Sequence, residues 1–475
     1  MRISFVNPPP ADGKLFIREG RCMQSADSWA TVWPPLTLAI LAAIARDRAE
    51  VDLFDCNVEH DYDIERTVQR IREFQPDMVL LNIAFPSLRS DTACAAAIAA
   101  ACPDAILVGF GGFFTILDEQ AMQACPPLHL GLTGEPEDSF AELLELALAG
   151  QPLRDIPGLM WHQDGDIHKG PPRPLIEDLD RLPYPARDLF HNDRYLLPHN
   201  GQPFTLINLA RGCPHHCSFC IATVYYGRGS RRHSVDYILE ELERCQRDHG
   251  LRQFLFWEEI FTLDRDFGLG ICEGIIQRGW DISWASTTRA DRLDRELLSA
   301  MKRAGCMLLG LGIESAHQPI LDGVNKGETV EDIQRGVLLC RQEGIPTMGH
   351  IVFGLPGETP ETAEATIRYV LSLGLDYIQC YPAVPYPKTG LGERAAKEGW
   401  LRADGWDSYD FGGDSVMDIG TITPAQVDQA RRDLYRRFYL RPGFAARQLP
   451  QLIRRPRQLL QASRFLNWMR PQHKR

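Results

Sequence analysis

The sequence lacks the features of a membrane-spanning or secreted protein. No run approaches the roughly 18 uninterrupted apolar residues that a helix needs to cross a bilayer, and no charged-then-apolar segment marks a signal peptide at the N-terminus. The 13 cysteines show no paired spacing outside residues 213–220, which favours a reducing compartment over a disulfide framework. We therefore expect a cytoplasmic protein, and its 475 residues suffice for two or three packed domains.

Acidic side chains are scarce only at the C-terminal end, although the net charge is −12 overall. Residues 431–475 carry 13 Lys or Arg and a single acid, Asp433. From about Pro456 onward, apolar residues and arginines fall on opposite sides of a predicted helix, which is typical of peripheral binding to anionic lipid. The alternative is a helix packed on the protein with a solvated basic face. No nucleic-acid partner is expected, because the rest of the chain would repel phosphate.

Strand-like and helix-like segments alternate along residues 1–150. This order predicts an α/β fold with a doubly wound, Rossmann-like parallel sheet, whose ligands bind at the carboxyl ends of the strands. The strand-like segments are 2–6, 51–54, 78–82 and 105–109, and the helical ones are 36–46, 64–73 and 92–101.

Residues 151–200 are rich in proline and charge, so we expect a linker there. A second alternation over residues 201–395 predicts six β/α units, an incomplete barrel with its chemistry at the carboxyl ends of the strands. Its strand-like segments are 204–209, 253–256, 282–285, 308–313, 349–353 and 377–381. Residues 396–475 form a predicted helical and basic C-terminal region, where Thr423-Pro-Ala-Gln426 marks a helix start.

Three cysteines, Cys213, Cys217 and Cys220, stand in a CxxxCxxC spacing directly after the first predicted barrel strand. Thiolates suit iron–sulfur chemistry, and a four-iron cluster needs four such ligands. Because the next cysteine, Cys245, lies beyond a predicted helix, one iron would stay open for a small molecule. The alternative is a zinc site completed by one of the two histidines inside the cysteine run, although zinc histidines usually have a separate paired spacing.

This cysteine spacing, with an aromatic residue just before the last cysteine, resembles the cluster loop of radical S-adenosylmethionine (SAM) enzymes. Nearly the whole chain is similar to their cobalamin-dependent branch, which carries an N-terminal cobalamin-binding domain, because further motifs follow in the family's order. They are Gly109-Phe-Gly-Gly112, Gly134-Glu-Pro-Glu-Asp-Ser-Phe140, Gly312-Ile-Glu-Ser315, Gly354-Leu-Pro-Gly-Glu-Thr359 and Pro385-Tyr-Pro-Lys-Thr389. Any one of these glycine motifs alone would indicate only a tight turn.

The resemblance implies three cofactors: a [4Fe-4S] cluster held by the three cysteines, SAM on the open iron, and cobalamin on the N-terminal sheet. Gly111, Gly112, Gly134 and Glu135 are the candidate cobalamin contacts. In the alternative, the sheet merely packs on the barrel and these are ordinary turn residues. Many cobalamin domains supply a histidine to the lower face of cobalt, but Asn57 stands at that position here, so no lower histidine ligand is expected.

The resemblance also implies SAM-binding residues on the barrel. Glu258 and Glu259 follow the second strand, where the family holds the amine of SAM. Because strand residues alternate faces, only one of the two should point inward. Glu259 is the candidate. Arg289 would pair with the carboxylate of SAM, or else with a neighbouring aspartate at the surface. Glu314 would accept from the ribose hydroxyls. Phe219 would flank the adenine, or merely exclude water from the cluster.

In this family one electron splits SAM into methionine and a 5′-deoxyadenosyl radical, which removes hydrogen from an unactivated carbon before methylcobalamin supplies a methyl group. We therefore expect a C-methyltransferase that takes its electron from a donor such as flavodoxin or ferredoxin. Some relatives form rings, rearrange or oxidise instead, and a non-catalytic zinc-binding module is the alternative from another class. The segment Tyr377–Tyr386 and the amphipathic tail predict a hydrophobic substrate, such as a hopanoid-like terpenoid of lipid biosynthesis or a tetrapyrrole.

Overall fold

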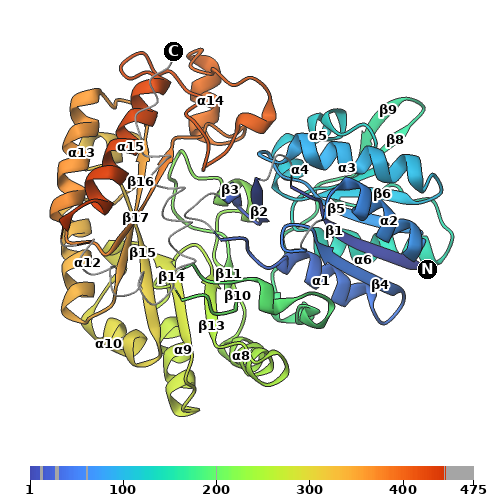
Figure 1. Ribbon diagram of the computed structural model, residues 1–475, viewed down its shortest axis with the longest axis horizontal. Helices are drawn as coiled ribbons and strands as arrows, with labels where there is room; N and C mark the ends of the chain where they lie inside the picture. Colours follow the sequence, from blue (N-terminus) through green and yellow to red (C-terminus); the bar gives the residue numbers. More distant parts are fainter. Residues whose placement is uncertain (11–13, 27–30, 60–61, 199, 443, 445–475) are drawn as a thin grey trace.

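The computed structural model describes residues 1–10, 14–26, 31–59, 62–198, 200–442 and 444, and it consists of two lobes that face each other (Figure 1). The predicted lipid-binding helix near Pro456 lies outside the described residues. None of the helices in the described part of the chain is long and apolar enough to cross a membrane.

The N-terminal lobe is built on a seven-stranded sheet of order β4-β1-β5-β6-β7-β8-β9. Its first five strands in that order run parallel, as predicted, because helices cross over between them. They are β4 (Glu50–Asp55), β1 (Arg2–Asn7), β5 (Met78–Asn82), β6 (Ile106–Phe110) and β7 (Leu130–Leu132). The antiparallel hairpin of β8 (Leu159–Gln163) and β9 (Asp166–Lys169) extends the sheet past residue 150 and pairs with β7, which would otherwise be an exposed edge.

Helices cover both faces of this sheet, so the doubly wound prediction is confirmed. One apolar layer lies under α1 (Leu36–Ala45) and α6 (Pro136–Leu148). The other lies under α2 (Ile64–Phe74), α3 (Leu88–Ala101), α4 (Gly112–Leu117) and α5 (Glu119–Ala124). Between the two layers every residue of β5 is buried, which is why this strand reads as a continuous apolar run.

The second lobe is a six-stranded parallel sheet in sequence order, curved into the predicted incomplete barrel with helices on its outside (Figure 1). The strands are β10 (Phe204–Asn208), β13 (Gln253–Trp257), β14 (Ser283–Thr288), β15 (Cys306–Glu314), β16 (Thr347–Phe353) and β17 (Tyr377–Pro382). The outer helices are α8 (Val235–His249), α9 (Arg265–Gln277), α10 (Arg295–Arg303), α12 (Val330–Gln342), α13 (Pro360–Ser372) and α15 (Pro424–Tyr439). One apolar core joins them to the outer face of the sheet.

Shorter elements lie between the lobes or at the carboxyl end of the barrel. The hairpin of β2 (Leu15–Glu19) and β3 (Cys22–Ala26) belongs to neither large sheet and lies between the two lobes (Figure 1). The remaining elements are β11 (Ala210–Arg211), β12 (Arg231–Arg232), α7 (Ala222–Tyr226), α11 (Gln318–Gly323) and α14 (Gly390–Lys397).

Helix α15 closes the edge of the barrel sheet. It begins at Thr423, as predicted, in a capping box with Gln426. The backbone N–H of Cys380 on β17 donates to Tyr435 Oη at 2.8 Å. Tyr439 Oη accepts from the N–H of Ile378 and donates to the carbonyl of the same residue, both at 3.0 Å. Two tyrosine hydroxyls therefore satisfy backbone groups of an edge strand.

We expect Tyr439→Phe to lower the free energy of unfolding by about 1–3 kcal/mol, because it leaves two buried backbone groups of Ile378 without that partner. Urea denaturation followed by circular dichroism measures the change. Tyr184→Phe, on a half-buried ring stacked on Tyr237, is the matched control and should change it by less than about 0.5 kcal/mol. Equal losses in both variants would contradict the role of the Tyr439 hydroxyl.

Candidate active site

The three cysteines lie in a loop that follows β10 at the carboxyl end of the barrel sheet. β11 pairs antiparallel with β12 and so closes this loop at its base. Gly212 has a φ of +91°, and a Cβ there would lie 2.0 Å from the carbonyl oxygen of Gly229, so the position requires glycine. Further along, the N–H of Ser218 donates to the carbonyl of Val324 at 2.9 Å, and its own carbonyl accepts from the N–H of Leu391 at 2.8 Å. The loop is thus anchored at its base and in its middle.

The thiols of Cys213, Cys217 and Cys220 are free and partly exposed. Burial raises the pKa of all three, to about 12 for Cys220, so each would release a proton on binding iron. Within the described ranges no three His, Cys, Asp or Glu side chains converge on a single ion. A four-iron cluster takes each thiolate on a different iron, so three separate thiols on one anchored loop fit it. Phe219 packs, partly buried, against the barrel core.

Glu259 is the carboxylate that faces the cysteine loop. Its charge acts on the thiols of Cys213 and Cys220, and it forms an ion pair with Arg21 from the β2–β3 hairpin. Burial raises the pKa of Glu259, and the guanidinium of Arg21 opposes that shift. Glu258 is buried with Oε1 lacking a partner among the described residues, and burial raises its pKa well above the ordinary value. Arg21, which nothing in the sequence pattern singled out, therefore brings a cation of the N-terminal half to the barrel.

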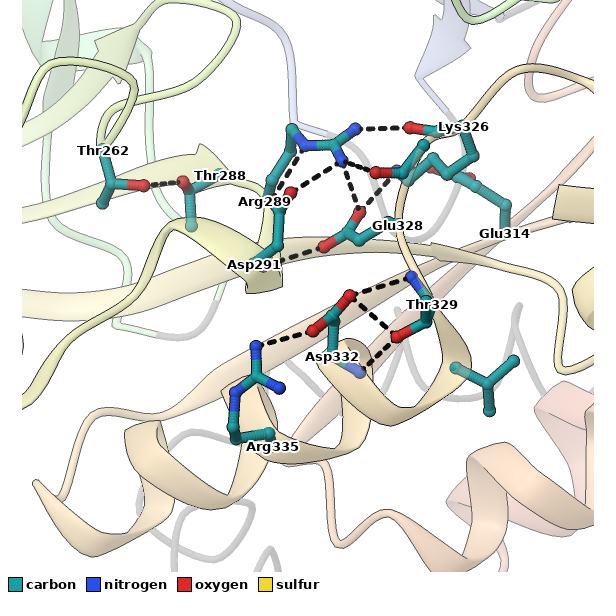
Figure 2. Close-up of polar contacts among 12 residues, drawn as sticks. Thr262, Thr288, Arg289, Asp291, Glu314, Lys326, Glu328, Thr329, Asp332 and Arg335 are labelled. Atoms are coloured by element: carbon teal, nitrogen blue, oxygen red, sulfur yellow. Dashed lines mark hydrogen bonds and ion pairs between the residues drawn. The ribbon is translucent and has the colours of Figure 1, made fainter. Parts of the chain in front are cut away.

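A second charged group lies near Cys217 of the loop. Glu314 ends β15 with a φ of +59°, a left-handed conformation that is uncommon for a residue with a side chain and is concentrated at functional sites. Lys326 Nζ donates to Glu314 Oε1 at 2.9 Å and lies 3.5 Å from Glu328 Oε2 (Figure 2). Although burial raises the pKa of Cys217, the ammonium of Lys326 opposes that shift. Glu314 was a candidate from its place at the end of a predicted strand, whereas no sequence pattern pointed to Lys326.

Arg289 is buried and almost fully engaged. It forms two bonds of 3.0 Å with the carboxylate of Asp291, and it donates to the carbonyls of Lys326 at 2.7 Å and Gly327 at 2.9 Å (Figure 2). The pairing with a neighbouring aspartate is therefore present, but inside the protein and not at its surface. In this arrangement Arg289 holds the segment that presents Lys326, and a direct contact with the carboxylate of SAM stays a prediction.

The three glycines predicted to contact cobalamin lie at the carboxyl ends of the N-terminal strands. Gly111, with a φ of +117°, has the carbonyl of Ile83 2.7 Å from a would-be Cβ. At Gly112 a Cβ would lie 2.6 Å from the sulfur of Met23 on β3. Gly134 has a φ of +73° and nothing within 4 Å of a would-be Cβ. Two of the glycines therefore permit close packing, and the space beside the third is open.

Glu135 takes part in a buried ion network between the lobes. Arg231 donates to both of its carboxylate oxygens, at 2.8 and 2.9 Å, and Arg211 Nη1 lies 3.3 Å from Oε1. Arg211 also donates to Glu137 at 2.6 Å. Burial alone would raise the pKa of Glu135, but Arg211 and Arg231 together hold it below the ordinary value. The carboxylate is thus engaged with the stem of the cysteine loop, and its contact with cobalamin stays a prediction.

The carboxyl edge of the N-terminal sheet also carries polar atoms that fit a large amide-bearing ligand. Asn7 Oδ1 on β1 and Asn82 Oδ1 on β5 are buried without a hydrogen-bond partner in the described part of the chain. Such atoms usually have a partner, and the carboxamide side chains of a corrin ring supply donors. The side chain of Asn57 is already hydrogen-bonded within the protein. Its amide nitrogen donates to Asp55, and its Oδ1 accepts from the N–H of Phe16.

Two family models match the chain, the radical SAM superfamily over residues 207–370 and the B12 binding domain over residues 26–144. An uncharacterized methyltransferase of Pyrococcus horikoshii is 34% identical over 413 residues, 87% of this chain and 89% of that protein. An anaerobic magnesium-protoporphyrin IX monomethyl ester cyclase of Cereibacter sphaeroides is 27% identical over 449 residues, 93% of this chain and 71% of that protein. A radical SAM methyltransferase of Kitasatospora setae, solved with cobalamin and a [4Fe-4S] cluster, shares the fold with a TM-score of 0.70 at 19% identity, covering 93% of this chain and 89% of that one.

We expect Gly212→Ala to lower the iron and sulfide content after anaerobic reconstitution to a small fraction of the wild-type value. The new methyl group would collide with the carbonyl of Gly229 and displace Cys213. Gly229→Ala is the matched control, since nothing lies within 4 Å of a Cβ there. Iron content that is unchanged in the Gly212 variant would contradict the anchoring.

We expect Glu135→Ala to destabilise the protein by about 3 kcal/mol, because it leaves two buried guanidinium groups short of a counter-charge. Iron loading of the cysteine loop should fall with stability. The control is Glu142→Ala on the same helix, whose carboxylate is 43% exposed, and it should cost less than about 1 kcal/mol. Thermal unfolding, iron assay and titration with hydroxocobalamin give the readouts. Weaker cobalamin binding at unchanged stability and iron content would instead assign Glu135 to cobalamin.

Proposed function

Because this chain belongs to the cobalamin-dependent radical SAM methyltransferases, we propose that it transfers a methyl group to an unactivated carbon of a small molecule. Its cofactors are a [4Fe-4S] cluster, SAM and cobalamin. The observation that carries the proposal is the meeting of the two carboxyl edges. Arg211 at the base of the cysteine loop pairs with Glu135 and Glu137 at the carboxyl edge of the other sheet, and this contact supports a shared site for the two cofactors.

When bound, the cluster supplies the electron that cleaves SAM, and cobalamin supplies the methyl group. The protein's own residues bind and orient. Cys213, Cys217 and Cys220 would hold the cluster through three of its four irons, and the fourth would be open to SAM. In this proposal Glu259, whose charge acts on Cys220, would accept from the ammonium of SAM, and Glu314, which accepts from Lys326, would also accept from its ribose.

Lys326 supplies the positive charge on this side of the site. Its ammonium is held by Glu314 and Glu328, and it lies close enough to influence the thiol of Cys217. Since Arg289 is engaged by Asp291 and two carbonyls, we propose that Lys326 is the cation next to the carboxylate of SAM. A ferredoxin or flavodoxin is the proposed source of the electron.

For the substrate we propose a tetrapyrrole or another flat aromatic molecule in preference to a plain terpenoid. The relative from Cereibacter sphaeroides is named for a magnesium-protoporphyrin ester and matches 93% of this chain. On the inner side of β17, Tyr377, Gln379 and Tyr381 are partly exposed, while Ile378 and Cys380 are buried under the outer helices. Aromatic rings with polar tips favour an aromatic partner over a purely aliphatic one. The name of the same relative supports ring formation as the second candidate.

Product mass distinguishes the two functions. We expect the reconstituted protein, supplied with SAM, hydroxocobalamin, a reductant and a small-molecule extract of its host, to yield a compound in which a methyl group replaces a hydrogen, a net gain of CH2. Deuterium from methyl-labelled SAM should appear in that compound, and the Cys217→Ala variant should give none. A modified compound without label would favour ring formation or oxidation. Protein that cleaves SAM but neither binds cobalamin nor modifies any compound would overturn the proposal.

A further inference from the structure

The inner side of the barrel sheet carries a cluster of polar side chains that are not among the residues proposed to bind the cofactors. Along β16 and β17, side chains alternate between buried positions under the outer helices and partly exposed positions on the inner side. His350 on β16 and Gln379 on β17 face each other in the ladder, and Tyr381 lies two residues beyond Gln379. All three are partly exposed, whereas Ile351 belongs to the apolar core. The three side chains therefore line the inside of the barrel.

Their hydrogen bonds determine which atoms remain available. Tyr381 Oη donates to Gln379 Oε1 at 2.6 Å, and it lies 3.3 Å from His350 Nδ1. The phenol has a single proton and donates it to Gln379. In the contact with His350, the imidazole Nδ1–H is therefore the donor and Tyr381 Oη is the acceptor. Nε2 of the imidazole is then a bare acceptor, and the amide nitrogen of Gln379 keeps two donors. An acceptor over Gly310 of β15 and a donor group on β17 thus both face the inside of the barrel.

The imidazole stays neutral in this setting. Burial lowers the pKa of His350 to about 4, and the nearby cations Arg21 and Lys326 act in the same direction. Gly310 on β15 makes room for the ring, because a Cβ there would lie 2.7 Å from His350 Nε2 and 3.0 Å from the methyl of Thr287. The ring of Tyr381 contacts Phe411 edge-on, with centroids 6.0 Å apart.

We propose that His350, Gln379 and Tyr381 form a substrate-binding subsite for a neutral polar group with both a donor and an acceptor, such as an amide, a lactam or a hydroxyl. The inference rests on the proposed function, since this group would belong to the molecule that is methylated. A hydrocarbon would leave the bare Nε2 and the amide without partners. A carboxylate would place a negative oxygen against the lone pair of Nε2. The subsite therefore selects a substrate that is polar at one end and positions its reactive carbon.

The test compares two products of the same reaction. Radical SAM cleavage releases 5′-deoxyadenosine, which measures the cofactor machinery, and the methylated compound from the host extract measures substrate positioning. We expect the double variant H350F/Q379L to keep its iron content, cobalamin absorbance and substrate-free release of 5′-deoxyadenosine within about twofold of wild type. The methylated compound should fall about tenfold or more, the effect of losing at least one good hydrogen bond.

Controls keep the outcomes distinct. Met348→Leu, on the same side of β16, exchanges one apolar side chain for another and should retain both products. Tyr381→Phe should lower the methylated compound less than the double variant does, because it frees His350 and Gln379 without removing them.

An unchanged ratio of methylated compound to 5′-deoxyadenosine in the double variant would overturn the subsite. Equal loss of both products would do the same, by assigning these residues to SAM binding. A wild-type protein that releases 5′-deoxyadenosine but modifies no compound of the extract would instead contradict the proposed function, and therefore also the subsite.

Discussion

The buried ion network of Arg211, Arg231, Glu135 and Glu137 is the constraint on which the rest of the site depends. Two arginines on the short ladder that closes the cysteine loop meet two carboxylates at the start of α6 in the other lobe. Charges taken out of water are stable only with their partners in place, so the network has one acceptable arrangement. That arrangement sets the base of the cysteine loop against the carboxyl edge of the N-terminal sheet.

The β2–β3 hairpin provides the second tie between the lobes. On one side Arg18 is fully buried against Asp91 and Ser87 of the N-terminal lobe. On the other side Arg21 pairs with Glu259 and its guanidinium lies 4.7 Å from the centroid of the Trp257 ring. One short hairpin therefore joins the N-terminal lobe to the end of barrel strand β13 beside the cysteine loop.

Part of this site could be predicted because its signal is local. The spacing of Cys213, Cys217 and Cys220 and the glycine at 212 are determined by neighbours in the chain, and the alternation of strand and helix predicted both sheets. Glu259 and Glu314 could be named as candidates because they lie at or just after the carboxyl ends of barrel strands. Lys326 and Arg21 could not, since each reaches the site from a loop whose sequence resembles any charged turn. Likewise the two carbonyls that Arg289 binds lie 37 and 38 residues away, and Arg231 lies 96 residues from Glu135, so these contacts left no local trace.

The sequence by itself determined the spacing of three soft ligands on one loop at the carboxyl end of a parallel strand, which is the basis for predicting a cluster with one open iron. It also determined the two sheets, through apolar runs of the right period. Only the tertiary structure decided which charges meet at the loop, and that the inner side of β16 and β17 is polar. The reason is that an ion pair or a polar face shared by two strands depends on contacts between segments far apart in the chain. A metal-binding motif and a strand depend on residues that are neighbours in the sequence.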